Sequence, residues 1–335
     1  MTFQRIQTPR FYVDHINWLI SRGIAPSEFT MVTGTDLINH DSGFVDAELF
    51  DMNPSRQVVF STSDSSDTRA DHLLFTIDKQ STSIGTDFIA ILNHNLNSAN
   101  AQFFMHSSTS AITSVNPANH SAAPILNASE SSDIFTPASD GDSIIELSSI
   151  TNRFVALQIE GVSSAFSSSN DVKIGAILIG KKFDMPTSPD LGVVRSVEYG
   201  NDILETPAGK RFSQARFLEG NLSSTTQSGQ PFRSVGTNTY MRFGGRTQYD
   251  LNFSFVSDEN LTSSNLANLG EDGTFINDVW NKTGGSHIPF IFTPDSTSTT
   301  AGDYLFARFG QNVFTSTQVA VSYTHLRAHE TRHDL

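Results

Sequence analysis

The sequence predicts an all-β protein made of two antiparallel β domains, and three observations support this. Short apolar runs with a period of two residues recur along the chain, whereas runs with helical periodicity are rare. Charged residues make up only 17% of the sequence, so it is poor in the residues that favour long helices. Ser, Thr and Asn are abundant and there are 26 Phe, a mixture typical of strands joined by polar loops.

In the first half of the chain, two runs alternate and two are continuously apolar. Leu73, Phe75 and Ile77 form one alternating run, and a second lies in residues 154–160, so each predicts a strand with one buried face. Residues 87–92 and 174–179 are almost entirely apolar and predict central strands covered on both faces, as in a two-sheet sandwich. The polar stretches 61–68 and 107–136 predict long exposed loops.

A domain boundary is predicted at residues 186–192, where Pro186, Pro189 and Gly192 interrupt both helix and strand patterns. We therefore assign residues 1–190 to one β domain and 191–321 to a second. The second domain is expected to be a β-sandwich or barrel with one short helix near residues 275–280, capped by Thr274 and ended by Gly284 and Gly285. Another short helix is expected at 14–22.

Charge and composition exclude several partner classes. The net charge of −14 argues against nucleic-acid binding, which needs a positive surface. No apolar run is long enough for a spanning helix, so membrane insertion is not expected, and the first residues do not have the pattern of a secretory signal. Without cysteine the chain has neither disulfides nor thiolate metal sites, which favours synthesis in a reducing cytoplasm, and no cofactor is expected.

Charge is unevenly distributed along the chain. Residues 1–190 carry 10 Lys and Arg against 21 Asp and Glu, whereas 207–246 carry six cations against the single Glu219. A basic stripe on an acidic chain indicates an interaction surface for an acidic partner, and the first domain of a neighbouring copy would qualify. A solvated strand face is the equally plain alternative. The residues of this stripe are Lys210, Arg211, Arg216, Arg233, Arg242 and Arg246.

The C-terminal segment contains a zinc-protease pattern. His329, Glu330 and His333 match the motif in which two imidazoles on one helix face bind zinc and the carboxylate activates water, and His325 lies one turn earlier. A zinc protease also needs a third ligand downstream and a supporting second shell. Residues 322–335 closely resemble the translated sequencing-adapter peptide found at the ends of assembled reading frames. We therefore predict a non-native stub at 322–335 and no metal site, with a metalloprotease as the least favoured alternative.

Two groups of segments carry a family resemblance. TDFIAILNHNL at 86–96, FVALQIE at 154–160 and KIGAILIG at 173–180 resemble galactose-binding-like, jelly-roll sandwiches in structural proteins of tailed phages. GGRTQYDLNFSF at 244–255, IPFIFTPD at 288–295 and YLFARF at 304–309 resemble tail proteins of marine phages. The resemblance implies a virion structural protein made in the host cytoplasm, and it supplies no catalytic residues.

These observations lead to one functional prediction and one alternative. The prediction is a non-enzymatic tail, baseplate or receptor-binding component that forms a homo-oligomer and contacts other virion proteins. The alternative is a carbohydrate-binding adhesin module that binds a host surface glycan through the first domain. Its candidate ligand residues are Asn93, His94 and Asn95, because amides and imidazoles at a strand end can bind sugar hydroxyls. The plain interpretation of the same residues is a hydrogen-bonded turn.

Overall fold

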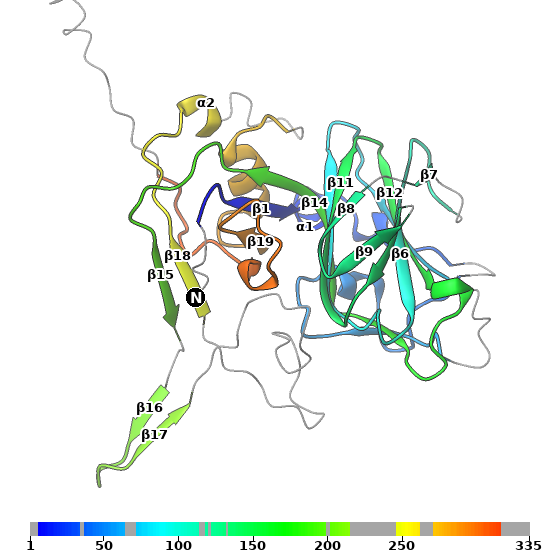
Figure 1. The fold of residues 1–335 in the computed structure, drawn as a ribbon, viewed down its shortest axis with the longest axis horizontal. Coiled ribbons are helices and arrows are strands. Elements are labelled where there is room, and N and C mark those ends of the chain that lie inside the picture. Colours follow the sequence, from blue (N-terminus) through cyan, green and yellow to red (C-terminus); the bar gives the residue numbers. More distant parts are fainter. Residues whose placement is uncertain are drawn as a thin grey trace, which may run out of the picture.

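Two antiparallel sheets packed face to face form the main body of the protein (Figure 1). The structure is a computed structural model and describes residues 6–33, 37–63, 72–113, 118–119, 122–131, 133–198, 202–214, 246–261 and 271–315. The expected all-β class is confirmed, since the described helices are few and short.

The first sheet has the strand order β20-β19-β1-β14-β5-β11-β8. Strand β5 lies near its middle and is buried along its whole length, between β14 and β11. The strands span Arg10–Asp14 (β1), Thr86–His94 (β5), Ala122–Leu126 (β8), Gly141–Ile150 (β11), Ala176–Asp184 (β14), Phe290–Thr293 (β19) and Leu305–Ala307 (β20).

The second sheet has the order β2-β4-β12-β6-β10-β9, and β7 pairs with β6 beside this path. Strand β12 is paired along its length with β4 on one side and β6 on the other. The strands span Phe29–Met31 (β2), His72–Asp78 (β4), Ala101–Ser108 (β6), Ala118–Asn119 (β7), Ala128–Ser131 (β9), Ile134–Pro137 (β10) and Phe154–Gly161 (β12).

Three two-stranded sheets and several short helices complete the described structure. The paired strands are β3 with β13, β15 with β18, and β16 with β17. These strands span Val58–Phe60 (β3), Val172–Ile174 (β13), Val194–Glu198 (β15), Asp202–Glu205 (β16), Arg211–Gln214 (β17) and Arg246–Asp250 (β18). The helical segments are α1 (Ile16–Ser21), η1 (Pro26–Glu28), η2 (Asp46–Leu49), η3 (Val162–Ser164), α2 (Asp258–Leu261), η5 (Ile276–Asn281) and η6 (Ala301–Asp303).

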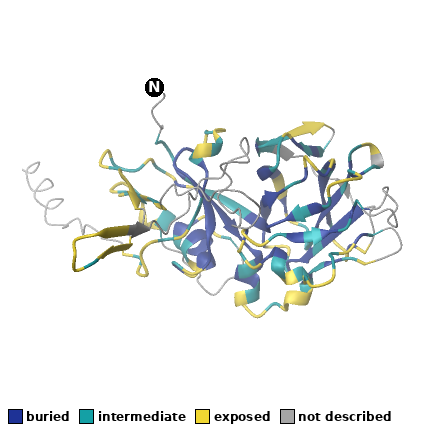
Figure 2. Ribbon diagram, turned by 90° about the horizontal axis from the view of Figure 1, so that it is seen from below, coloured by how far each residue is buried: buried dark blue, intermediate teal, exposed yellow. Residues whose placement is uncertain are grey.

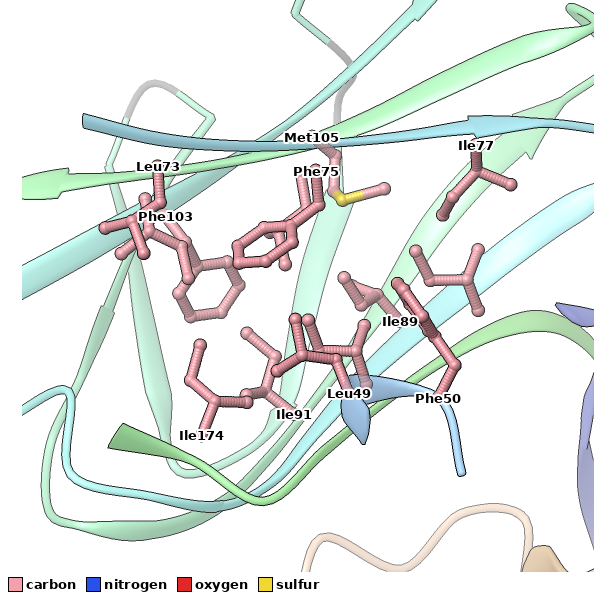
Figure 3. Packing of buried hydrophobic residues seen from close by; sticks show 14 of the residues in the cluster. Leu49, Phe50, Leu73, Phe75, Ile77, Ile89, Ile91, Phe103, Met105 and Ile174 are labelled. Carbon is pink, nitrogen blue, oxygen red and sulfur yellow. The ribbon is translucent and has the colours of Figure 1, made fainter. Parts of the chain in front are cut away.

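The main core lies between the two large sheets. Figure 3 shows Phe75 and Phe103 from the second sheet facing Ile89 and Ile91 from the first, with Leu49 of η2 closing one side. The continuous apolar run at 87–92 forms a central strand as predicted, whereas the run at 174–179 is divided at Gly175 between the end of β13 and the start of β14. Strand β5 places Ile89 and Ile91 in this core and Phe88 in a second cluster on its other face. Both faces of the strand therefore exclude water, which accounts for its unbroken apolar sequence.

Two local predictions are corrected. Strand β4 is covered on both faces, because Leu74 packs with Ile112 and Ala156 while Phe75 faces the main core. The expected loop at 107–136 begins at the end of β6 and contains the described strands β7, β8 and β9 and most of β10. Its Ala- and Ser-rich sequence has weak strand propensity of its own, so pairing with β11 and β10 decides its structure.

The first sheet continues across the boundary predicted at residues 186–192. Strand β19 pairs antiparallel with β1, and β20 pairs with β19, so residues after 290 extend a sheet that begins at Arg10. Phe11 of β1 lies 5.6 Å from Phe275, ring centre to ring centre, and 5.3 Å from Phe292. In the described part of 191–321, the other strands form the two-stranded sheets β15–β18 and β16–β17. The two predicted domains thus share one sheet and one aromatic cluster.

Both predicted helices are present. Helix α1 is followed by Gly23 in a left-handed conformation, φ +94°, and the Asp14 carboxylate accepts the backbone N–H of Asn17 at 2.8 Å near its start. Segment η5 has π-helical hydrogen bonding over Ile276–Asn281 and is followed by Gly284 and Gly285, with φ of +59° and +63°. The Thr274 hydroxyl accepts the Asn277 N–H at a long 3.4 Å, so the expected cap is weak.

Candidate functional site

The three residues predicted to bind a ligand lie at the end of β5: Asn93 and His94 are its last two residues and Asn95 follows directly. Asn93 is 4% exposed and has φ +50°, a conformation that Asn tolerates better than most residues. Its side-chain amide donates to the Pro54 carbonyl at 2.6 Å, and its backbone N–H donates to Asp142 Oδ1 at 2.8 Å. Its carbonyl accepts from Gln57 at 2.7 Å. Asn93 therefore ties the end of β5 to the segment 54–57 and to the start of β11.

His94 is buried and neutral. Nδ1 accepts the Leu96 N–H at 3.2 Å, which places the proton on Nε2, and Nε2 then donates to Ser143 Oγ at 2.8 Å. Burial lowers the pKa of His94 to about 3. A second proton on Nδ1 would also face the Leu96 N–H, so the local hydrogen bonds favour the same neutral form.

Asn95 is bonded in the same way. Its side chain donates to the Asp171 carbonyl at 2.7 Å and accepts the Lys173 N–H at 2.6 Å. Together the three residues connect β5 to β13 and to the start of β11. A sugar could bind the same side chains only by displacing these hydrogen bonds. Ligand binding here therefore stays a prediction, whereas the structure shows the hydrogen-bonded arrangement.

The predicted basic stripe falls only partly within the described residues. Arg216, Arg233 and Arg242 lie outside them. Lys210 and Arg211 belong to the hairpin formed by β16 and β17, and Arg246 begins β18. Arg211 Nε pairs with Glu205 Oε2 across the hairpin at 2.9 Å, and Lys210 Nζ lies 5.2 Å from the centre of the Phe212 ring.

The β16–β17 hairpin projects away from the sandwich in Figure 1, and residues 202–212 are exposed except Thr206, which is half-buried (Figure 2). Thr206 begins its turn: its backbone bonds with Gly209 and Lys210, and Gly209 takes φ +77°. Leu204 and Phe212 are directly opposite in the register and so lie on one face, while Ile203 lies on the other. These three side chains are 69%, 50% and 64% exposed.

This hairpin belongs to a region where exposed apolar side chains are concentrated. Among the described residues nine large hydrophobic side chains are exposed, and seven of them lie between positions 191 and 255. Scattered single residues of this kind are ordinary, so their concentration in one part of the chain is what makes this part the candidate interaction region. The seven are Leu191, Val194, Val197, Ile203, Leu204, Phe212 and Phe255.

A buried ionic centre lies where the C-terminal segment meets the sandwich. Glu271 pairs with Lys181 of β14 and accepts the Gly85 N–H at 3.0 Å. The Nζ atom of Lys282 lies 3.5 Å from Asp278, 3.8 Å from Glu271 and 5.2 Å from the Trp18 ring centre of α1. Since the Lys282 side chain is almost fully buried, these neighbouring groups stabilise its positive charge.

Burial shifts the pKa of several groups around this centre. It lowers the pKa of Lys79 to about 8, and Lys79 Nζ donates to the Ile84 and Ile150 carbonyls at 2.6 and 3.0 Å. It raises the pKa of Asp87 to about 7, although Asp87 accepts the Lys182 N–H. The pKa of His15 is lowered mainly by burial and secondly by the charge of Lys282, whereas the backbone of Gly85 has the opposite effect. The hydrogen bonds of Lys79 and Asp87 lie within the sandwich, and the contacts of Glu271 with Lys181 and Gly85 join the C-terminal segment to it.

The sequence did not indicate this centre, because its members are scattered from His15 to Lys282 and share no motif. Nor did it single out Ile203 and Leu204, which only the structure shows to be paired in a hairpin and exposed. Within the described ranges no group of three or more His, Asp or Glu side chains is arranged to hold a metal ion. Likewise, no described helix is long and apolar enough to cross a membrane. His325, His329, Glu330 and His333 lie outside the described residues.

None of the protein-family models, curated proteins or solved structures that were compared with the chain matches it.

Proposed function

We propose that the chain is a structural subunit of a bacteriophage virion, in the tail or baseplate, and that it acts by binding other proteins rather than by catalysis. The observation that carries the proposal is the concentration of exposed apolar side chains between residues 191 and 255. Leaving such side chains in water forfeits the favourable free energy of burying them, which a partner surface would recover. The resemblance of 86–96 and 244–255 to phage structural proteins supports the choice of assembly.

The carbohydrate-binding alternative is less well supported. The side-chain polar atoms of its candidate residues already form hydrogen bonds within the fold; these residues are Asn93, His94 and Asn95. The apolar side chains of the β16–β17 hairpin are exposed instead, so protein binding explains a surface feature that sugar binding leaves unexplained.

Copurification tests the proposal. The chain is co-expressed with the proteins encoded beside its gene, in the original form and with Leu204→Ser and Phe212→Ser combined. We expect virion proteins to copurify with the original chain and to be lost from the double variant. Val45→Ser is the matched control, because Val45 is 56% exposed but lies outside the 191–255 region. Absence of any copurifying virion protein, or equal loss in the control, would refute the proposal.

A further inference from the structure

Lys282 is a buried amine that lies beside two largely buried carboxyl groups. Its side chain is 2% exposed, and those of Glu271 and Asp278 are 11% and 7% exposed. The Nζ atom lies 3.8 Å from Glu271 Oε1 and 3.5 Å from Asp278 Oδ1, and the Trp18 ring covers it at 5.2 Å. Within the described ranges this Nζ atom has no hydrogen-bond partner. A buried ammonium held only by such long contacts is costly.

Burial favours the neutral form of this amine. It lowers the pKa of Lys282, although the carboxylates of Asp278 and Glu271 act in the opposite direction. A neutral amine is a nucleophile, and burying a lysine is one of the ways in which proteins activate it. Burial also raises the pKa of Asp278, although Lys282 opposes this, so the Asp278 carboxyl is better suited to exchange protons near neutral pH.

Glu271 is held as an acceptor for such an amine. Its Oε1 atom accepts the Gly85 N–H at 3.0 Å, and its Oε2 atom pairs with the Lys181 ammonium of β14. These two donors fix the carboxyl beside Lys282. They would also stabilise the negative charge that builds up on the carboxyl oxygens when a nucleophile attacks the carbon between them.

We propose that Lys282 and Glu271 condense within the folded chain to form an isopeptide bond, with Asp278 relaying the proton. A proton first passes from the Lys282 ammonium to the Glu271 carboxylate. The amine nitrogen then attacks Glu271 Cδ, and Asp278 takes a proton from the nitrogen and delivers it to the departing oxygen, which leaves as water. One N–C bond forms and one C–O bond breaks, so the step needs no oxidant, reductant or co-reactant.

The surroundings favour this reaction in two ways. The bond replaces a buried ammonium and carboxylate by a neutral amide, which removes the cost of keeping two charges away from water. The 3.8 Å separation from Oε1 is also close to the approach of about 3–3.5 Å at which reacting atoms meet. The product closes residues 271–282 into a covalent ring that contains η5 and remains hydrogen-bonded to Gly85.

Trypsin digestion of the full chain followed by mass spectrometry tests the proposal. Between Arg246 and Arg308 the chain has one tryptic site, after Lys282, so a free lysine gives the separate peptides 247–282 and 283–308. We expect instead a single peptide 247–308 that is lighter than its sequence by one water, with fragment ions that place the link between Glu271 and Lys282. Lys79 is the internal control, because its buried amine bonds to backbone carbonyls and should leave cleavage unaffected.

Two variants separate the roles of the carboxyl groups. Glu271→Ala should restore cleavage after Lys282. Asp278→Asn keeps the size of the side chain and should slow bond formation about a hundredfold or more, because the proton relay is lost. Asp87→Asn is the matched control, since Asp87 is a buried carboxyl that accepts the Lys182 N–H, and it should still yield the linked peptide. Urea unfolding shows whether each variant is folded.

The digest of the original chain decides the question whatever the stability of the variants. Complete release of 247–282 from the folded original chain would overturn the proposal, and so would a loss of water that maps to Asp278 instead of Glu271. A folded Asp278→Asn variant that links as fast as the original chain would overturn the role given to Asp278.

Discussion

Replacing His94 by Gln is expected to make the protein less sensitive to acid. His94 is buried with both ring nitrogens bonded in the neutral form, and burial lowers its pKa to about 3. In the unfolded chain the same side chain has its ordinary pKa of 6.5. Below pH 6.5 the unfolded state therefore binds a proton that the folded state does not bind, so the unfolding free energy decreases as the pH falls towards 3.

The size of the effect follows from the two pKa values. Each pH unit below 6.5 costs about 1.4 kcal/mol for one such group. At pH 5 the original chain should have lost about 2 kcal/mol through His94 alone, compared with pH 8. Gln has no charge to gain, so the variant lacks this loss. It gives up the acceptor for the Leu96 N–H, which lowers its stability by the same amount at every pH.

Urea unfolding at pH 8, 7, 6 and 5 measures the prediction. The difference in unfolding free energy between the two proteins should shrink by about 2 kcal/mol from pH 8 to pH 5. Asp14, Asp87 and His15 also titrate, but they are present in both proteins and cancel in the difference. His287→Gln is the control, because this histidine is exposed. Parallel stability curves for His94→Gln and the original chain would show that the reasoning is wrong.

Four further outcomes are expected. Lys79→Met should lower the unfolding free energy by about 2–4 kcal/mol, because the Ile84 and Ile150 carbonyls lose their buried donor, and an unchanged urea midpoint would contradict this. Gly180→Ala should lower the unfolding free energy by about 3 kcal/mol or more, since a Cβ would lie 1.9 Å from the Val13 carbonyl oxygen. Gly192→Ala is the control and should be neutral, because nothing lies within 4 Å of its added Cβ. Equal thermal midpoints for the two variants would contradict this. A 1–190 fragment should unfold at a lower urea concentration than the full chain, because it loses the pairing of β19 with β1. Equal urea midpoints would instead indicate two independent domains. Truncation to 1–321 should leave the melting temperature unchanged, and neither form should cleave casein with zinc; chelator-sensitive cleavage by the full chain would reverse the interpretation of 322–335.

Local sequence patterns predicted much of the fold. Residues 87–92 lie on the central strand β5 and 176–179 on the interior strand β14, because a short, continuously apolar run favours burial on both faces. A helix forms near 275–280 because its apolar spacing and the following glycines act locally. The polar turn at Asn93–Asn95 also follows from residue type, since Asn accepts the left-handed conformation that Asn93 adopts.

Other features depend on contacts between distant parts of the chain. Strands β8 and β9 have weak intrinsic propensity and form because β11 and β10 offer them partners. The return of β19 to β1 depends on matching edges and on the packing of Phe11 with Phe292 across almost the whole chain.

By itself, then, the sequence determined the all-β class, the most buried strands and the uneven charge, because these follow from periodicity and composition. Only the tertiary structure decided that β1 and β19 share a sheet, that Glu271 contacts Lys181 and Gly85, and that Leu204 and Phe212 are exposed. The physical reason is that pairing, burial and pKa depend on which distant groups are brought together, and no local pattern encodes that.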